Sequence, residues 1–213
     1  NSILGGEGFR FHDLNPQRPF LIINTTDNTR QATKDIRSDN LNLDFTFTDK
    51  HFSKIKSGLA QYPIANAVMA SSAFPAAFNY NTLRNYSADE KRYVHLFDGG
   101  TSDNLGLSAL EKVLSKIDPP SKRQPDKQIK LLVILIDAYR PTRGKSSRDP
   151  DPRSVFDFIL DSNFIDAYDT LMAKMRTDKI DKMISILNNG DSRSGKLIHF
   201  EFDDLKEIRP DIY

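Results

Sequence analysis

Short apolar runs alternate with helix-like patterns along this chain. Residues 20–23 form an apolar run after a proline and lead into the polar run 24–27, which predicts a buried strand that closes in a polar turn. Residues 41–48 alternate apolar and polar side chains, a pattern typical of a half-buried strand. Residues 64–78 are rich in alanine and predict a closely packed helix that ends near Pro75.

The second half of the chain continues this alternation. Residues 129–136 are the most apolar stretch, as expected for a strand buried on both faces in the middle of a parallel sheet. Residues 107–117 place apolar side chains on one side of a helix. The other predicted elements are a strand at 92–97, one or two helices within 154–188 and a strand at 196–202. Together these patterns predict an α/β fold.

Composition narrows the class of protein. The 213 residues suit a single domain, and no linker composition divides them strongly. Lys plus Arg number 30 and Asp plus Glu 29, a balance that gives no support to a nucleic-acid partner bound through bulk positive charge. The absence of cysteine excludes disulfides, zinc–thiolate sites and a cysteine nucleophile. No signal peptide is visible, and no apolar run approaches the ~20 residues that span a bilayer.

Three predicted strands end in a carboxylate: Asp27, Asp98 and Asp137. A single aspartate at such a position usually starts a turn or caps a helix. Asp98 stands out because two glycines follow it and allow a sharp turn or a close backbone approach. If all three strands were parallel and adjacent, the three carboxylates could share Mg²⁺, which leaves a metal-dependent hydrolase as an alternative. No D-x-D motif supports this alternative.

No serine triad can be assembled from the sequence. His95 lies three positions before Asp98, so the two side chains point to opposite sides of a strand that runs through Phe97. The other histidines have no motif around them. The nucleophile motif G-x-S-x-G is also absent, since the nearest string, residues 190–195, is one residue too long.

Two blocks together resemble patatin-like phospholipases. Residues 70–75 (ASSAFP) resemble the "ASSA-x-P" block of that family. Residues 98–100 (DGG), followed by 103–105 (DNL), resemble its "DGG…NN-x-P" block, and the strand end at 26–27 resembles its "TDL" strand end. The order and approximate spacing fit over residues 20–107, whereas only the general pattern fits further downstream.

The resemblance implies an α/β lipid acyl hydrolase of the phospholipase A class, with a mainly parallel central sheet flanked by helices (patatin-like, FabD/lysophospholipase-like). It implies a Ser–Asp dyad in which Asp98 is the aspartate and neither a cofactor nor a metal takes part. Gly99 and Gly100 would form the turn that positions Asp98. The remaining residues implied to support or wall the site are Ser71, Ser72, Pro75 and Asn104.

The family's G-x-S-x-G serine and glycine-rich oxyanion loop precede these blocks and are not in this sequence. We therefore expect residues 1–213 to be a single patatin-like domain lacking its N-terminal part, with which it could remain associated. The expected substrate is a phospholipid or another acyl ester. The basic residues of 140–153 could touch anionic headgroups, although neighbouring acids favour a solvated loop. A non-catalytic lipid-binding or interaction module is the second alternative.

Overall fold

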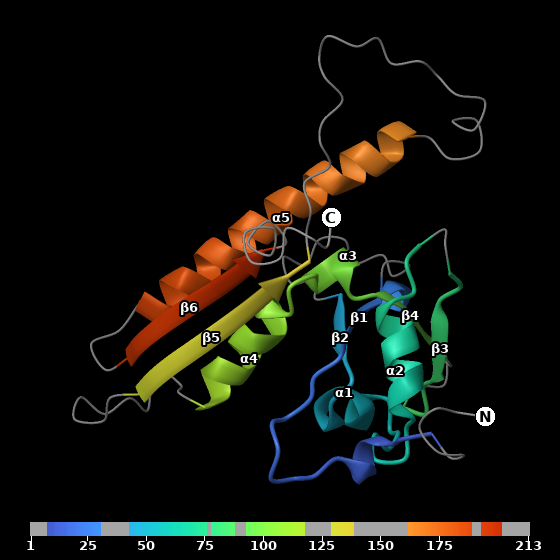
Figure 1. Cartoon of the computed structure of the whole chain (residues 1–213). Coiled ribbons are helices and arrows are strands. Elements are labelled where there is room, and N and C mark those ends of the chain that lie inside the picture. The colour runs from blue at the N-terminus through green and yellow to red at the C-terminus, as the bar shows by residue number, and fades with distance from the viewer. Residues whose placement is uncertain are drawn as a thin grey trace, which may run out of the picture. The chain divides into compact units, whose positions relative to one another are not determined.

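The computed structural model describes residues 8–30, 43–75, 78–87, 93–117, 129–138, 162–188 and 193–201. The chain divides into two compact units, Asn1–Leu110 and Glu111–Tyr213, which are described separately (Figure 1). The predicted basic loop at 140–153 and the first part of the helical pattern at 154–188 lie outside the described residues.

A four-stranded sheet organises the first unit. Its order is β2-β1-β4-β3, and each neighbouring pair is antiparallel. The strands are β1 (Asn24–Asp27), β2 (Asp44–Thr46), β3 (Asn81–Arg84) and β4 (Tyr93–Asp98). Across the two central strands, Thr25 lies opposite Asp98 and Asp27 lies opposite Leu96. This register places the carboxyl end of β4 beside the beginning of β1.

The first strand lies four residues later than predicted. The polar run Asn24–Asp27 forms the strand, whereas Phe20 precedes it with 73% of its surface exposed. Thr25 and Thr26 are buried because their hydroxyls have backbone partners. Thr25 donates to the Phe45 carbonyl at 2.8 Å, and Thr26 donates to the Asp98 carbonyl at 2.8 Å. These bonds remove the cost of burying two hydroxyls, and β-branched side chains suit a strand.

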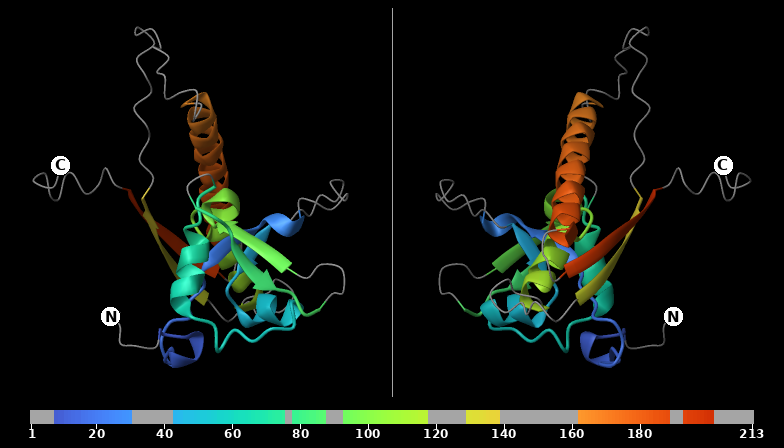
Figure 2. Two further views of the ribbon diagram at one scale, coloured as in Figure 1. Left: turned by 90° about the vertical axis from the view of Figure 1, so that its right-hand side faces the viewer. Right: turned by 90° about the vertical axis from the view of Figure 1, so that its left-hand side faces the viewer.

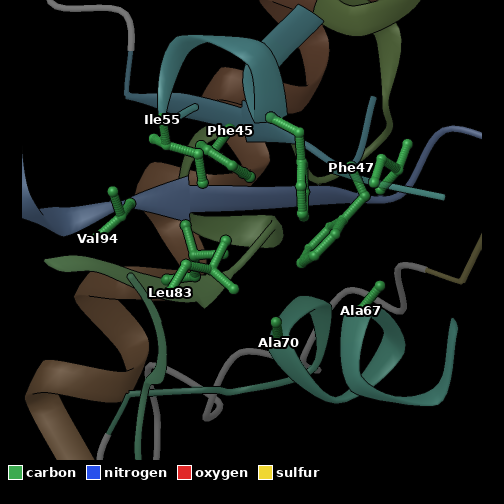
Figure 3. Packing of buried hydrophobic residues seen from close by; sticks show 10 residues of the cluster. Phe45, Phe47, Ile55, Ala67, Ala70, Leu83 and Val94 are labelled. Carbon is green, nitrogen blue, oxygen red and sulfur yellow. The ribbon is translucent and has the colours of Figure 1, made fainter. Parts of the chain in front are cut away.

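Short helices pack around this sheet. They are α1 (Asp49–Lys54), α2 (Ile64–Ser71) and α3 (Gly100–Asp103), with 3₁₀ turns at Phe11–Asp13 and Asn28–Arg30. The helix α4 (Leu107–Ile117) begins at the end of this unit. Ala67 and Ala70 of α2 face the aromatic core, where Phe47 is fully buried (Figure 3). Their small side chains let α2 approach closely. The predicted helix at 64–78 is thus real but ends at Ser71.

The mixed α/β class is confirmed, but a mainly parallel sheet is not. Every pairing in the four-stranded sheet is antiparallel, and among the described strands only β5 and β6 pair in parallel. Residues 85–92, which join β3 to β4, are fewer than the dozen or so that a parallel crossover needs. The antiparallel direction of the β3–β4 pair thus follows from the length of its connection, which the apolar pattern does not report.

The second unit contains β5 (Ile129–Asp137), α5 (Ser162–Asn188) and β6 (Arg193–Glu201). The two strands form a parallel pair, and α5 packs against β6 (Figure 2). Gly195 permits this approach, because a Cβ there would lie 2.7 Å from Cδ2 of Leu187 on α5. None of the described helices is long and apolar enough to cross a membrane.

The strand β5 is buried on one face only, so the prediction of burial on both faces is wrong. Val133, Leu135 and Asp137 are buried, whereas Leu132 and Ile136 are 60% and 81% exposed. Side chains alternate along a strand, and among the described strands β5 pairs with β6 alone. The continuous apolar run at 129–136 therefore forms a strand that is buried on one face and exposed on the other.

Candidate active site

Asp98 lies at the carboxyl end of β4, and its position is set by three hydrogen bonds. Its backbone N–H donates to the Ala73 carbonyl at 3.0 Å, and its own carbonyl accepts from the Thr26 hydroxyl. The carboxylate oxygen Oδ1 accepts from the Gly100 N–H at 2.6 Å. No donor among the described residues contacts the second oxygen, Oδ2. The side chain is half-buried, and one of its oxygens is held while the other remains open to a ligand.

The two sequence blocks that suggested the site are joined through their backbones. Besides the bond from Asp98 to Ala73, the Gly99 N–H donates to the Ser71 carbonyl at 3.1 Å. The Ser72 hydroxyl donates to the Val68 carbonyl at 3.0 Å, within its own helix. The end of α2 is therefore tied to the turn after β4 by peptide groups and not by serine side chains.

A cavity of about 560 Å³ opens beside Asp98. This volume falls within the range of pockets that hold small ligands. Its lining is Ile22, Ile23, Asn24, Val68, Ser71, Ser72, Asp98, Gly99, Gly100, Asp103, Asn104, Leu105 and Gly106. Six of the seven predicted site residues are thus brought together, whereas Pro75 is not part of this lining. The lining contains both apolar and polar residues, which suits an ester group attached to a hydrocarbon chain.

The two glycines after Asp98 allow close approach of backbone and carboxylate. A Cβ on Gly99 would lie 2.5 Å from the carbonyl oxygen of Asn24, at the start of β1. A Cβ on Gly100 would lie 2.9 Å from Oδ1 of Asp98 itself. Real Cβ atoms do not tolerate the first distance, so a side chain at position 99 would force β1 and β4 apart.

Two residues of the site were missed in the sequence. Asn24 was predicted in a turn, but it lines the cavity, and its Oδ1 is buried with no hydrogen-bond partner among the described residues. Asp103 lies in the block 103–105, but the sequence pattern does not indicate what its side chain does. It is 3% exposed, and its two oxygens accept from the N–H groups of Ser108 and Ala109, each at 3.1 Å. Asp103 therefore caps α4 and anchors the loop that borders the cavity.

Replacing Asp103 by Ala is expected to lower the free energy of unfolding by about 1–2 kcal/mol, the usual cost of losing a helix cap. Urea denaturation of the 213-residue chain, followed by far-UV circular dichroism, measures this change. Asp103→Asn keeps one acceptor oxygen and should recover part of the loss. An unchanged midpoint for Asp103→Ala would show that the cap does not stabilise α4.

The structure contradicts the shared magnesium site. That hypothesis needed parallel strands, but β1 and β4 are antiparallel, so Asp27 and Asp98 lie at opposite ends of their ladder. Asp27 lines a different cavity, together with Asp44 and His51. Asp137 belongs to the second unit, where it contacts Arg176 and His199. His95 contacts Thr82 and Tyr80 and not Asp98, in agreement with the prediction that the two side chains point to opposite sides of the strand.

Asp137 lies in a charged cluster with His199 and Glu201. Potential ligand atoms of these three residues lie within 4.8 Å of one another. The Arg176 guanidinium, from α5, bonds both carboxylates. Burial lowers the pKa of Arg176, but hydrogen bonds and charge from Asp137 and Glu201 outweigh it and leave this pKa above its ordinary value. The guanidinium thus supplies the positive charge at the place where a metal ion would lie.

Comparison with known proteins decides the family. The sequence model described as patatin-like phospholipase matches residues 3–110, half of the chain. The chain belongs to the patatin-like phospholipase family. No curated protein and no solved structure matches it. The patatin-like match ends at Leu110, where the first unit also ends, and it includes every residue that lines the Asp98 cavity. The strands β5 and β6 lie beyond it.

Proposed function

We propose that this patatin-like chain supplies the aspartate of a Ser–Asp dyad that hydrolyses lipid acyl esters, with Asp98 as that aspartate. The family supports lipid acyl hydrolase activity in general. The observation that carries the finer proposal is the carboxylate of Asp98, whose Oδ1 is held by Gly100 while Oδ2 accepts no bond from the described residues. A carboxylate oriented in this way, beside a ligand-sized cavity, suits a general base.

The reaction follows from this arrangement. A serine hydroxyl is a weak nucleophile, so it needs a base within hydrogen-bond reach. Asp98 would accept the hydroxyl proton as the serine oxygen attacks the acyl carbonyl. Collapse of the tetrahedral intermediate would break the ester bond, and the proton on Asp98 would pass to the leaving alcohol. Water would then hydrolyse the acyl-serine, with Asp98 accepting its proton and returning it to the serine.

The serine itself has to come from elsewhere. The chain holds no G-x-S-x-G turn, and the Ser72 hydroxyl is bonded to its own helix. We propose that another polypeptide segment presents the serine and the oxyanion donors to the Asp98 cavity, within a patatin-like domain whose complete sheet is mainly parallel. In this proposal Gly99 and Gly100 position the aspartate. Ser71, Ser72 and Asn104 form part of the wall of the site, whereas Pro75 lies outside this lining.

Ester hydrolysis by two proteins tests this proposal. The complete product of the gene that encodes this chain is expected to hydrolyse p-nitrophenyl esters and phosphatidylcholine, with no loss of rate in a chelator. The 213-residue chain is expected to show no hydrolysis. Hydrolysis by the 213-residue chain that disappears in Ser72→Ala would refute the assignment. Loss of activity in a chelator would favour a metal-dependent hydrolase. Lipid binding without turnover by the complete product would favour a non-catalytic module.

A further inference from the structure

One amide side chain in the lining of the Asp98 cavity has an oxygen that no described residue satisfies. Asn24 begins β1 and lines this cavity. Its Oδ1 is buried and has no hydrogen-bond partner among the described residues. A buried polar atom without a partner lowers the stability of a fold, and native proteins contain few of them. The oxygen of Asn24 therefore needs an explanation.

Two glycines of the same cavity leave room for Asn24. A Cβ on Gly99, in the turn after β4, would lie within 3.3 Å of three Asn24 atoms, which are the carbonyl oxygen, the carbonyl carbon and Cβ. Gly106, directly before α4, has a φ of +69°, and a Cβ there would lie 3.0 Å from Nδ2 of Asn24 and near no other atom. The turn after β4 and the loop before α4 thus both close on Asn24, which fixes the place of its amide.

A second unsatisfied oxygen lies close to the same turn. Within the described part of the chain, the other buried side-chain atom without a hydrogen-bond partner is Oγ1 of Thr101. Thr101 belongs to α3 and follows Gly100, whose N–H holds the carboxylate of Asp98. The helix α3 packs against β1, the strand that Asn24 begins. Both unsatisfied oxygens therefore belong to the elements that surround the Asp98 turn.

The chemistry of an amide oxygen decides what can satisfy Asn24. This oxygen only accepts hydrogen bonds, so its partner has to bring an N–H or O–H group. The ester group of an acyl lipid contains acceptor oxygens and no donor, whereas a polypeptide backbone carries an N–H at every residue except proline. A half-turn of the amide about its Cβ–Cγ bond exchanges Oδ1 and Nδ2, which brings the oxygen beside Gly106 in the cavity lining. The oxygen then suits an incoming peptide group better than an ester.

We propose that Asn24 is a positioning residue, which holds the serine-bearing polypeptide segment by accepting a backbone N–H of that segment at its Oδ1. This inference rests on the proposed function, in which another segment presents the serine to the Asp98 cavity. The hydrogen bond removes the cost of the unsatisfied oxygen, so docking of the segment stabilises this end of β1. It also fixes the serine relative to Asp98, and a small displacement of a reacting group slows a reaction strongly.

The substitution Asn24→Leu is expected to act in opposite directions in two proteins. Leucine has nearly the shape of asparagine but no hydrogen-bonding atom in its side chain. In the 213-residue chain the substitution removes an unsatisfied oxygen, so the urea midpoint of unfolding should stay or rise. In the complete gene product it removes the acceptor of the docked segment, so the midpoint should fall. Equal shifts in the two proteins, or no fall in the complete product, would overturn the proposal.

Asn81 provides the matched control for these midpoints. Its Nδ2 donates to the Asn66 carbonyl at 3.4 Å, so its partner lies within this chain, and it is not part of the Asp98 cavity. Asn81→Leu is therefore expected to shift the midpoints of the two proteins by the same amount. Asn24→Ala adds no bulk, and it should reproduce the difference between the proteins if Asn24→Leu disturbs the packing.

Ester kinetics of the complete gene product give the second measurement. Asn24→Leu is expected to lower kcat about tenfold or more with KM unchanged, because a displaced serine slows the chemical step. A higher KM with unchanged kcat and an unchanged urea midpoint would assign Asn24 to the substrate and overturn the proposal. The midpoints are measured without turnover. An inactive complete product with opposite midpoint shifts would therefore refute the proposed hydrolysis and still support docking at Asn24.

Discussion

Asp98→Asn is expected to lower ester hydrolysis by the complete gene product about 10³-fold or more while leaving the fold intact. The Asn side chain has the same shape, and its Oδ1 still accepts from the Gly100 N–H. It cannot accept a proton, so the serine would lose its base. The rate of p-nitrophenyl ester hydrolysis reports the loss. The unfolding midpoint reports that the turn is preserved.

The chain offers a closely matched control for this experiment. Asp27 also ends a strand, and its Oδ1 accepts from the N–H two residues later, that of Thr29, at 3.0 Å. Asp27→Asn makes the same chemical change in the same kind of turn, but it lies outside the Asp98 cavity. Hydrolysis is expected to persist in Asp27→Asn. Comparable losses in both variants, or more than a tenth of the activity left in Asp98→Asn, would refute the role of Asp98.

Gly99→Ala is expected to lower the free energy of unfolding by about 3 kcal/mol, the upper part of the usual range for overpacked sites. The new Cβ would lie 2.5 Å from the Asn24 carbonyl oxygen. That oxygen belongs to the backbone of β1, whose next residue, Thr25, is fully buried, so it cannot move aside like a flexible side chain. Urea denaturation of the 213-residue chain measures the loss.

Two other glycines calibrate this result. A Cβ on Gly58 would meet nothing within 4 Å, so Gly58→Ala should change the free energy of unfolding by less than about 0.5 kcal/mol. Gly100→Ala would press on the movable carboxylate of Asp98, so it should cost less stability than Gly99→Ala and still impair hydrolysis. Equal stabilities for Gly99→Ala and Gly58→Ala would show that β1 and β4 are not closely joined at this turn.

Local periodicity predicted several elements well. The amphipathic helix at 107–117 is α4, and the strands predicted at 92–97 and 196–202 correspond to β4 and β6. These periodic patterns depend only on residues that are neighbours along the chain, so they can be recognised without the tertiary structure. The basic loop at 140–153 lies outside the described residues and stays a prediction.

Long-range hydrogen bonds determine the position and direction of strands that periodicity does not predict. The strand β1 can include Thr25 and Thr26 because the backbone carbonyls of Phe45 and Asp98, both distant in the sequence, accept hydrogen bonds from their hydroxyls. The direction of β4 beside β1 likewise separates Asp27 from Asp98 and removes the shared metal site. Such pairings depend on where other strands lie, which an apolar pattern does not encode.

The sequence by itself determined the family and the α/β class, and it singled out Asp98 with its two glycines as the candidate site, because motif residues and local patterns can be read directly along the chain. Only the tertiary structure decided how the site is built. It joined the Asp98 turn to α2 through the carbonyls of Ser71 and Ala73, and it brought Asn24 into the cavity. The bonds between the Asp98 turn and the end of α2 are made by peptide groups. Since every residue has a peptide group, a pattern of side chains does not predict these bonds.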